Sequence, residues 1–226
     1  MYTSILFDLD GTLSESAPGI TKSLQYGLTA VGIEVSHPET LTRFIGPPLN
    51  VELAAVYHLS SWQIGQVISR FRERYESVGL LECEPYPGIR ELIRDCRDAG
   101  RILGVASSKP EPHVKTMLEN FGIASCFHVI CGSSIEDELS NTSSADNKSQ
   151  IIRRAVALLR RQSQPAPSSQ TVMVGDTRYD IQGARSNGLP AIGVTYGYGS
   201  RKELIEAGAS HLAASAEELR SLLLSR

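Results

Sequence analysis

The sequence lacks a strong charge of either sign and any long apolar segment. Its 22 Lys and Arg residues nearly balance 25 Asp and Glu residues, which leaves a net charge of -3. That balance gives no electrostatic reason to expect nucleic acid or an anionic membrane as a partner. The first residues carry no Lys or Arg, and the opening apolar run stops at Asp8, far short of a signal peptide or a membrane span. We therefore expect a cytoplasmic protein.

Cysteine is scarce as well. The four cysteines are Cys83, Cys96, Cys126 and Cys131, and no two of them have the Cys-x-x-Cys spacing of a zinc or redox motif. We expect buried, reduced thiols in a reducing compartment and neither disulfides nor a zinc site. The rest of the composition is ordinary for a globular protein, with 41% hydrophobic and 21% charged residues. A chain of 226 residues can form one large domain or a domain with an insert.

The first informative stretch is 5–13, Ile-Leu-Phe-Asp-Leu-Asp-Gly-Thr-Leu. Its three apolar residues predict a strand buried on both faces, and Asp8 and Asp10 follow where such a strand should end. Ionised carboxylates need partners in a low-dielectric setting, so these two residues indicate a cation site at the strand end. A turn with solvated carboxylates would explain the same two residues as well.

Residues 16–84 predict a helical insert, because they hold no convincing strand. Prolines and glycines divide this region into several helices, the first of which begins near Ser16. The last helix opens with a capping box at 60–63 and reaches about Val78. The turn-rich segment 84–88 then ends the insert.

Beyond Pro87 helices and strands alternate, which predicts a mostly parallel sheet covered by helices. Strands are expected at 102–106, 127–131, 171–174 and 191–195, and helices at 89–99, 112–121, 148–161, before Gly188 and after Ser200 and Ser215. The polar stretch 132–147 is expected to form a surface loop, and 162–170 a connector. The sequence thus predicts an α/β fold with a doubly wound sheet from 1–15 and 85–226 and an all-helical insert at 16–84.

Unusual polar residues follow three of the predicted strands, as the pairs Asp8 and Asp10, Ser107 and Ser108, and Asp176 and Asp180. The carboxyl ends of parallel strands meet at one edge of the sheet, where ligands bind. Acids gathered there would repel one another, which favours a bound divalent ion. Oxygen ligands with room for water and a phosphate oxygen suit Mg²⁺ better than Zn²⁺, since no set of His and Cys ligands is available.

In order along the chain, these residues resemble the four signature motifs of the haloacid dehalogenase superfamily of phosphatases, and the resemblance covers essentially the whole chain. The matching residues are Asp8-Leu9-Asp10-Gly11-Thr12 for the first motif, Ser107 for the second, Lys148 for the third, and Gly175-Asp176 with Asp180 for the fourth. The helical insert resembles the small cap domain of phosphoglycolate phosphatases and related 5'-nucleotidase-like enzymes. Segments 107–110 and 197–200 also look like that subgroup.

The resemblance implies a Mg²⁺-dependent phosphomonoester hydrolase that works through an aspartyl-phosphate intermediate. Asp8 would be the nucleophile, and Asp10 the general acid and base. Asp176 would bind the metal together with the Asp8 carboxylate and the Asp10 backbone carbonyl. A phosphate dianion repels a carboxylate nucleophile, so Mg²⁺, a lysine and N–H donors must offset its charge before attack.

Other residues would contact the phosphate directly. Ser107 would hold one phosphate oxygen. The backbone N–H groups of Leu9, Gly11 and Thr12, and those near Ser108, could form an anion-binding nest.

The remaining assignments are more open. We favour Lys148 over Lys109 as the lysine that offsets the phosphate charge, and Lys109 would then be solvated or touch substrate. Asp180 could contact the metal site through water, which we rank first, bind the metal directly, or merely cap a helix. Arg43 and Gly46, in a turn of the insert, are our candidates for substrate specificity.

Several functions stay open at this point. Phosphoglycolate, nucleoside 5'-monophosphates and pyrophosphate are all possible substrates, and a phosphosugar mutase would use the same acid pair. A haloacid dehalogenase proper would need neither the second acid nor Mg²⁺. A phospho-acceptor signalling module also combines acids, a hydroxyl and a lysine, but it has no need of the helical insert. We expect a monomer or homodimer that acts on a small phosphorylated metabolite.

Overall fold

The computed structural model describes residues 2–133, 144–162 and 170–224. The chain divides into two compact units, one made of Met1–Ser14 with Pro85–Arg226 and the other of Glu15–Glu84. Within the described ranges, no helix combines the length and the apolar character that crossing a membrane requires.

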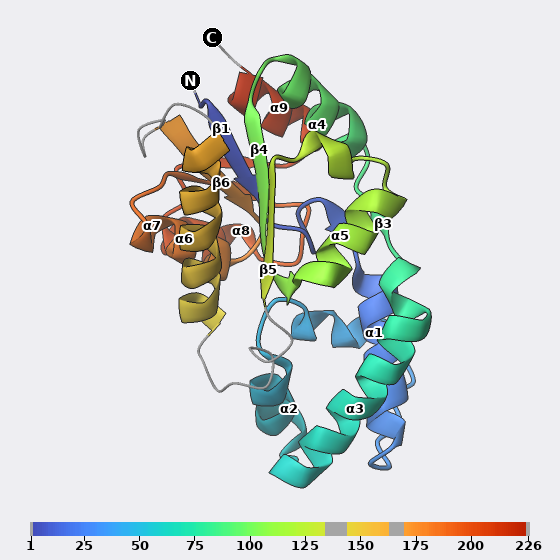
Figure 1. Cartoon of the computed structure of the whole chain (residues 1–226). Coiled ribbons are helices and arrows are strands. Elements are labelled where there is room, and N and C mark those ends of the chain that lie inside the picture. The colour runs from blue at the N-terminus through green and yellow to red at the C-terminus, as the bar shows by residue number, and fades with distance from the viewer. Residues whose placement is uncertain (1, 134–143, 163–169, 225–226) are drawn as a thin grey trace. The chain divides into compact units, whose positions relative to one another are not determined.

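A six-stranded sheet forms the centre of the first unit (Figure 1). Its strands lie in the spatial order β5 (Val129–Ser133), β4 (Ile102–Pro110), β1 (Ser4–Phe7), β6 (Thr171–Gly175), β7 (Ala191–Val194) and β8 (His211–Ala213). All five neighbouring pairs are parallel. β1 lies between β4 and β6, and all of its residues are buried, which explains its uninterrupted apolar run.

Helices cover both faces of this sheet (Figure 1). One face carries α6 (Ser144–Gln162), α7 (Arg178–Ser186) and α8 (Arg201–Ala207), and the other carries α4 (Ile89–Asp98), α5 (Glu111–Asn120) and α9 (Ala216–Leu224). A buried core joins the first group to the sheet and includes Leu6, Ala106, Ile152, Met173 and Ile181. The predicted doubly wound α/β fold is therefore confirmed.

The order of the strands reverses between β1 and β6. The chain leaves β1 toward β4 and β5 on one side, and leaves β6 toward β7 and β8 on the other. In open α/β sheets, ligands bind beyond the carboxyl ends of the two strands where this reversal occurs. The fold thus directs attention to the residues that follow β1 and β6.

The second unit is helical. Its elements are α1 (Ala17–Thr29), the 3₁₀ helix η1 (Pro38–Phe44), α2 (Leu49–Tyr57), α3 (Ser61–Ser77) and the 3₁₀ helix η2 (Gly79–Leu81). Buried Leu24, Leu41, Leu53 and Val67 bring one residue each from α1, η1, α2 and α3 into a common core. Two short strands, β2 (Ser14–Glu15) and β3 (Glu84–Pro85), pair where the chain enters and leaves this unit.

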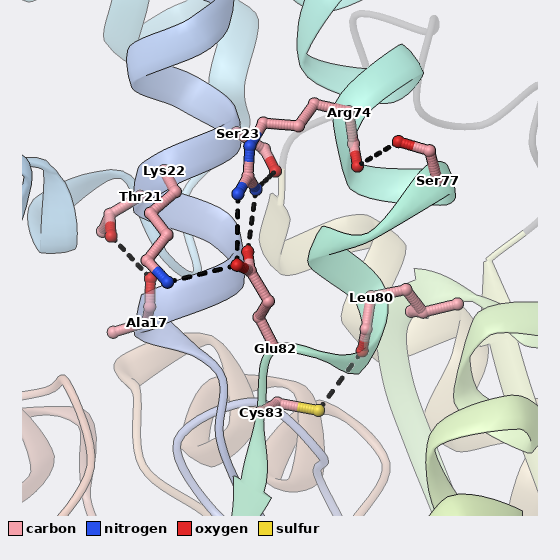
Figure 2. Close-up of polar contacts among 9 residues, drawn as sticks. All are labelled: Ala17, Thr21, Lys22, Ser23, Arg74, Ser77, Leu80, Glu82 and Cys83. Atoms are coloured by element: carbon pink, nitrogen blue, oxygen red, sulfur yellow. Dashed lines mark hydrogen bonds and ion pairs between the residues drawn. The ribbon is translucent and has the colours of Figure 1, made fainter.

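A polar network inside the second unit centres on Glu82 (Figure 2). Its carboxylate accepts hydrogen bonds from Arg74 Nη1 at 2.8 Å, Arg74 Nη2 at 3.2 Å and Lys22 Nζ at 3.1 Å. Arg74 Nη1 also donates to Ser23 Oγ at 3.0 Å, and the Gly19 N–H donates to the Glu82 carbonyl at 3.0 Å. Glu82 therefore ties the end of this unit to both α1 and α3.

Most predicted elements are present, but several bounds differ. β4 continues to Pro110, whereas we expected it to end at Ala106, and α6 begins at Ser144, before the expected start at Lys148. The short strand β8 and the 3₁₀ helix η3 (Ala124–Cys126) were not predicted. Of the expected surface loop and connector, residues 134–143 and 163–169 lie outside the described residues.

Candidate active site

Three buried carboxylates gather at the carboxyl ends of the central strands. Asp8 follows β1, Asp176 follows β6, and Asp180 lies in the first turn of α7. One oxygen from each lies within 4.8 Å of the others. The structure therefore brings together acids from the first and fourth predicted motifs, at the point where the strand order reverses.

Lys148 reaches this cluster from α6. Its Nζ lies 2.7 Å from Asp8 Oδ1 and 2.8 Å from Asp180 Oδ1, and it donates to the Ala106 carbonyl at 3.1 Å. The Asp180 contact is an ion pair and not a well-directed hydrogen bond, since Oδ1 has no partner of good hydrogen-bond geometry among the described residues. Burial disfavours the ammonium, but the two carboxylates outweigh burial and raise the pKa of Lys148, so this lysine stays charged.

Asp180 also caps a helix. Its Oδ2 accepts hydrogen bonds from the Thr177 N–H at 3.0 Å and from the Thr177 hydroxyl at 2.8 Å, in a capping box at the start of α7. A Cβ on Gly175 would lie 2.2 Å from the Asp180 Cβ, so only glycine allows this close approach. One oxygen of Asp180 thus caps α7 while the other faces Lys148.

Asp10 is paired with Lys109. Asp10 Oδ2 lies 3.0 Å from Lys109 Nζ, and both side chains are largely buried. Asp10 Oδ1 is buried without a hydrogen-bond partner in the described part of the chain. Leaving a buried carboxylate oxygen without a hydrogen-bond partner costs free energy, so such an oxygen is typical of a group that binds a ligand or a water molecule. Lys109 is therefore not simply solvated.

Ser107, predicted as the second motif, and its neighbour Ser108 lie in β4, next to β1. Ser107 is buried, and its Oγ accepts a hydrogen bond from the Lys109 N–H at 3.3 Å. Ser108 is half-buried. Because an oxygen that accepts one hydrogen bond keeps its own proton to donate, Ser107 can still offer that proton to a ligand.

The turn after β1 is tightly folded. Gly11 has φ +82°, and a Cβ there would lie 2.0 Å from Asp176 Oδ2, so this residue must be glycine. The Gly11 N–H donates to the Ser14 carbonyl at 2.9 Å, and the Thr12 N–H donates to the Leu9 carbonyl at 3.3 Å. The turn itself therefore uses two N–H groups that we expected to bind phosphate. This argues against Gly11 and Thr12 in that role and leaves Leu9 as the candidate.

Asp176 is held by the loop after β7. The Tyr198 N–H donates to Asp176 Oδ2 at 2.8 Å, and the Thr12 hydroxyl donates to Oδ1 at 3.4 Å. The Tyr196 hydroxyl in turn donates to the Thr12 carbonyl at 3.0 Å. A Cβ on Gly197 would lie 2.4 Å from the Asp176 Cβ. The loop thus fixes the orientation of Asp176 through its backbone and through Tyr196.

Tyr196 did not emerge as a site residue from the sequence. Its contact with Thr12 joins positions 184 apart, so no local pattern reports it. The available signal is the Gly-Tyr-Gly sequence at 197–199, one residue beyond the predicted strand 191–195.

The family is shown by comparison with known proteins. The family model described as "Haloacid dehalogenase-like hydrolase" matches residues 5–194. The chain belongs to this family. A 5'-nucleotidase of Pseudomonas aeruginosa is 35% identical over 222 residues, which cover 98% of this chain and 96% of that protein. The crystal structure of a predicted phosphatase from Clostridium acetobutylicum has a TM-score of 0.88 and 39% identity, and covers 100% of both chains.

Two further relatives of this haloacid dehalogenase-like hydrolase have different names. Tyrosine-protein kinase PtkA of Mycobacterium tuberculosis is 35% identical over 222 residues, covering 97% of this chain and 72% of that protein. Phosphoglycolate phosphatase of Salmonella typhimurium is 26% identical over 221 residues, covering 86% and 81%. Together with the family match, these comparisons confirm the resemblance and indicate a phosphoric monoester hydrolase.

The balance of charges at the carboxylate cluster shows whether this hydrolase could bind a metal ion there. Among the described residues, the four carboxylates Asp8, Asp10, Asp176 and Asp180 have two lysines as ion-pair partners, so their full ionisation would leave an excess of two negative charges. Burial raises the pKa of Asp8 to about 7 against the opposing Lys148, and burial with Asp180 nearby raises the pKa of Asp176. A divalent ion would offset this excess charge. All donors are oxygens, which suits a hard cation such as Mg²⁺.

The predicted specificity residues lie in the second unit. Arg43 is in η1, with an exposed side chain 3.9 Å from the Glu52 carboxylate. Gly46 follows η1 and has φ +102°. Phe44, the residue after Arg43, is instead buried in the core of this unit. The parts of Arg43 and Gly46 in substrate binding stay predictions.

Proposed function

We propose that this protein hydrolyses a small phosphomonoester in a Mg²⁺-dependent reaction that phosphorylates Asp8. The observation that carries the proposal is the buried cluster of Asp8, Asp176 and Asp180 with Lys148 beside the first carboxylate. Such a cluster combines a carboxylate nucleophile with the positive charge that a phosphate dianion needs before attack.

The metal would be held by the carboxylates of Asp8 and Asp176 and the backbone carbonyl of Asp10. When bound, Mg²⁺ supplies positive charge beside the phosphate. Lys148 supplies further positive charge from the protein. Ser107 donates its hydroxyl proton to a phosphate oxygen, while its Oγ keeps the hydrogen bond from the Lys109 N–H.

The chain's own residues then carry out two steps. The first step needs Asp10 in its protonated form: an oxygen of Asp8 bonds to phosphorus, the bond between phosphorus and the leaving oxygen breaks, and Asp10 gives that oxygen its proton. In the second, Asp10 takes a proton from a water that attacks phosphorus, and Asp8 leaves as a carboxylate. Lys109, now paired with Asp10, is placed to exchange that contact for a negatively charged group of the substrate.

The substrate would be a small phosphometabolite. From the sequence we expected an enzyme most like a phosphoglycolate phosphatase, with a 5'-nucleotidase or pyrophosphatase as alternatives. The relative named 5'-nucleotidase is 35% identical, whereas the one named phosphoglycolate phosphatase is 26% identical. We therefore place nucleoside 5'-monophosphates first and phosphoglycolate second.

A second candidate function is transfer of phosphate to a tyrosine. It rests on the 35% identity with the relative named tyrosine-protein kinase PtkA. The chemistry would differ only in the acceptor, because a phenol oxygen would replace water in the second step. We rank hydrolysis first, since the relatives named 5'-nucleotidase and phosphoglycolate phosphatase both point to it.

The proposal is tested by phosphate release from a panel of phosphometabolites with Mg²⁺. We expect EDTA to abolish release and added Mg²⁺ to restore it, and Asp8→Asn to be inactive. Full activity in metal-free protein would contradict the metal's part. Transfer of labelled phosphate to tyrosine without release would favour the second function.

Replacing Asp10 by Asn tests the two-step chemistry. An alkoxide needs a proton to leave, whereas a nitrophenolate does not, so Asp10→Asn should slow alkyl phosphates far more than the first step with an aryl phosphate. With the aryl substrate, phosphorylated Asp8 should accumulate, because the attacking water has lost its base. Rapid quench with mass spectrometry can detect it. Equal losses on both substrates without phosphoenzyme, in a folded variant, would assign Asp10 another role.

A further inference from the structure

The position of α6 determines where the Lys148 ammonium lies. Its Nζ contacts three oxygens, from Asp8, Asp180 and the Ala106 carbonyl, at 2.7–3.1 Å. A small shift of α6 would disturb all three contacts together. Groups that stabilise developing charge must be held within about 0.5 Å of the productive geometry, so something must fix this helix.

Asn187, directly after α7, provides such a connection. Its Nδ2 lies 2.9 Å from the Ser149 carbonyl, 3.1 Å from Ser149 Oγ and 2.8 Å from the Gly183 carbonyl. Three oxygens surround this atom, which identifies it as the donor end of the amide. Ser149 is the residue next to Lys148. One side chain therefore joins α7 to α6 beside the lysine.

Gly183 lets the two helices come together at the same place. A Cβ on Gly183 would lie 3.2 Å from Lys148 Cγ and 3.3 Å from the Ser149 nitrogen. These distances are tighter than ordinary contact, so a side chain there would require its neighbours on α6 to give way by a few tenths of an ångström. The stem of Lys148 therefore packs directly on the backbone of α7.

Three residues, two in α7 and one directly after it, lie on the face toward Lys148 and its neighbour Ser149. Asp180, Gly183 and Asn187 are spaced by three and then four positions, the spacing of neighbours along one side of a helix. Asp180 contacts the ammonium, Gly183 the stem, and Asn187 the backbone next to the lysine. α7 and the residue after it thus contact the ammonium and stem of Lys148 and the backbone of its neighbour Ser149.

We propose that Asn187 is a positioning residue for Lys148. Its hydrogen bond to the Ser149 carbonyl fixes α6 against α7, so that the ammonium stays beside Asp8 when phosphate binds. The inference rests on the proposed function, in which Lys148 offsets the phosphate charge. Within the described residues, the hydrogen bonds of the Asn187 amide go to Ser149 and Gly183 and not to the acids of the site.

Arg185 offers a matched control on the same helix. Its Nη1 donates to the Ala207 carbonyl at 2.9 Å, at the end of α8. Arg185→Ala therefore removes a hydrogen bond from the end of α7 to a backbone carbonyl of α8. Asn187→Ala removes the hydrogen bonds to the Ser149 and Gly183 carbonyls and to Ser149 Oγ, and only these include a link to the helix that carries Lys148.

The experiment is a double-mutant cycle with Lys148→Met. Asn187→Ala should lower kcat by about 10-fold, and Arg185→Ala by less than about 2-fold. Lys148→Met should lower kcat by about 100-fold, and adding Asn187→Ala to it should cost less than about 2-fold more. Asn187→Asp keeps the size of the side chain but replaces the donor by an acceptor-only carboxylate facing two carbonyls, so it should lower kcat at least as much as Asn187→Ala does.

The same cycle is measured on the binding of inorganic phosphate in the presence of Mg²⁺, by calorimetry. Asn187→Ala should weaken phosphate binding in the wild-type background and leave it unchanged in Lys148→Met. If the wild-type protein binds phosphate but hydrolyses no substrate, the proposed function fails, and the binding cycle still decides this inference. Equal losses from Asn187→Ala with and without Lys148, or equal losses from Arg185→Ala, would overturn it.

Discussion

Lys148 and Lys109 both end in buried ion pairs, yet they contact different carboxylates. Lys148 Nζ lies between Asp8 and Asp180, and Lys109 Nζ lies on Asp10. A lysine beside the proposed nucleophile can offset phosphate charge during transfer. A lysine beside the proposed acid can instead exchange its partner for the substrate. The sequence left this choice open with a preference for Lys148, and the contacts favour the same assignment.

The two lysines should therefore differ in kinetics. Lys148→Met keeps the length of the stem and removes the charge, so it should lower kcat by about 100-fold or more. Lys109→Met should mainly raise KM, by a few-fold. Steady-state kinetics with saturating Mg²⁺ can measure both effects, with circular dichroism to show that each variant is folded. The reverse pattern would exchange the two roles.

Not every contact at this scale could be predicted from the sequence. Asp8, Asp10 and Asp176 were predicted because a charged residue directly after a buried strand is unusual and is visible locally. The pairing of Lys109 with Asp10 was not, because the register of β4 against β5 shifts between Ala106 and Pro110. Simple alternation along a strand no longer tells which way a side chain points beyond such an irregularity.

At the scale of elements, the loop at 196–199 holds the proposed metal ligand Asp176. A Cβ on Gly197 would lie 2.3 Å from the Gly11 carbonyl oxygen and 2.5 Å from Asp176 Oδ2. Gly197→Ala should therefore displace the carboxylate. Gly65 in α3 has nothing within 4 Å of its ideal Cβ, so Gly65→Ala is a matched control.

We expect Gly197→Ala to lower Mg²⁺ affinity by about 10-fold or more, since groups that orient metal ligands typically have effects of this size. High Mg²⁺ should restore part of the activity. Gly65→Ala should leave both unchanged. Calorimetric Mg²⁺ titration measures the affinity without turnover. Unchanged Mg²⁺ binding in a folded Gly197→Ala variant would show that this loop does not orient the metal site.

The predictions of helices and strands were wrong where local sequence preference and tertiary context disagree. The capping box of Ser60 and Gln63 predicts the start of α3 correctly, because the two residues of the motif are only three positions apart. The start of α6 was placed too late, since the polar residues from Ser144 onward favour loops on propensity alone. β8 is three residues long and partly exposed, so it has no apolar run to indicate it.

For the molecule as a whole, the main feature is the path of the chain, which leaves the sheet unit after Ser14, forms the helical unit and returns to the sheet unit at Pro85. β1 must pair with β4, so Phe7 faces Val105 although the whole second unit lies between them in sequence. The sequence indicated the insert because strand patterns stop after the opening stretch and resume only beyond Pro87. It could not show how the insert is closed, since Glu82 binds Arg74 and Lys22 through contacts that no local pattern reports.

The closing network gives a prediction for stability (Figure 2). Arg74 holds the pKa of Glu82 below its usual 4.5, so the ionised carboxylate stabilises the folded chain. Glu82→Gln should lower the free energy of unfolding by about 1 kcal/mol at pH 7, because two hydrogen bonds from Arg74 are weakened. Since the folded-state pKa of Glu82 is lowered, this difference in unfolding free energy should be complete above pH 4.5 and shrink as pH falls below it.

Glu73→Gln is the control, because the ion pair of Glu73 with Arg70 is exposed. Denaturation curves at pH 7 and at a pH below 4.5 measure the effect. Equal losses of unfolding free energy from Glu82→Gln and Glu73→Gln would mean that Glu82 does not close the unit.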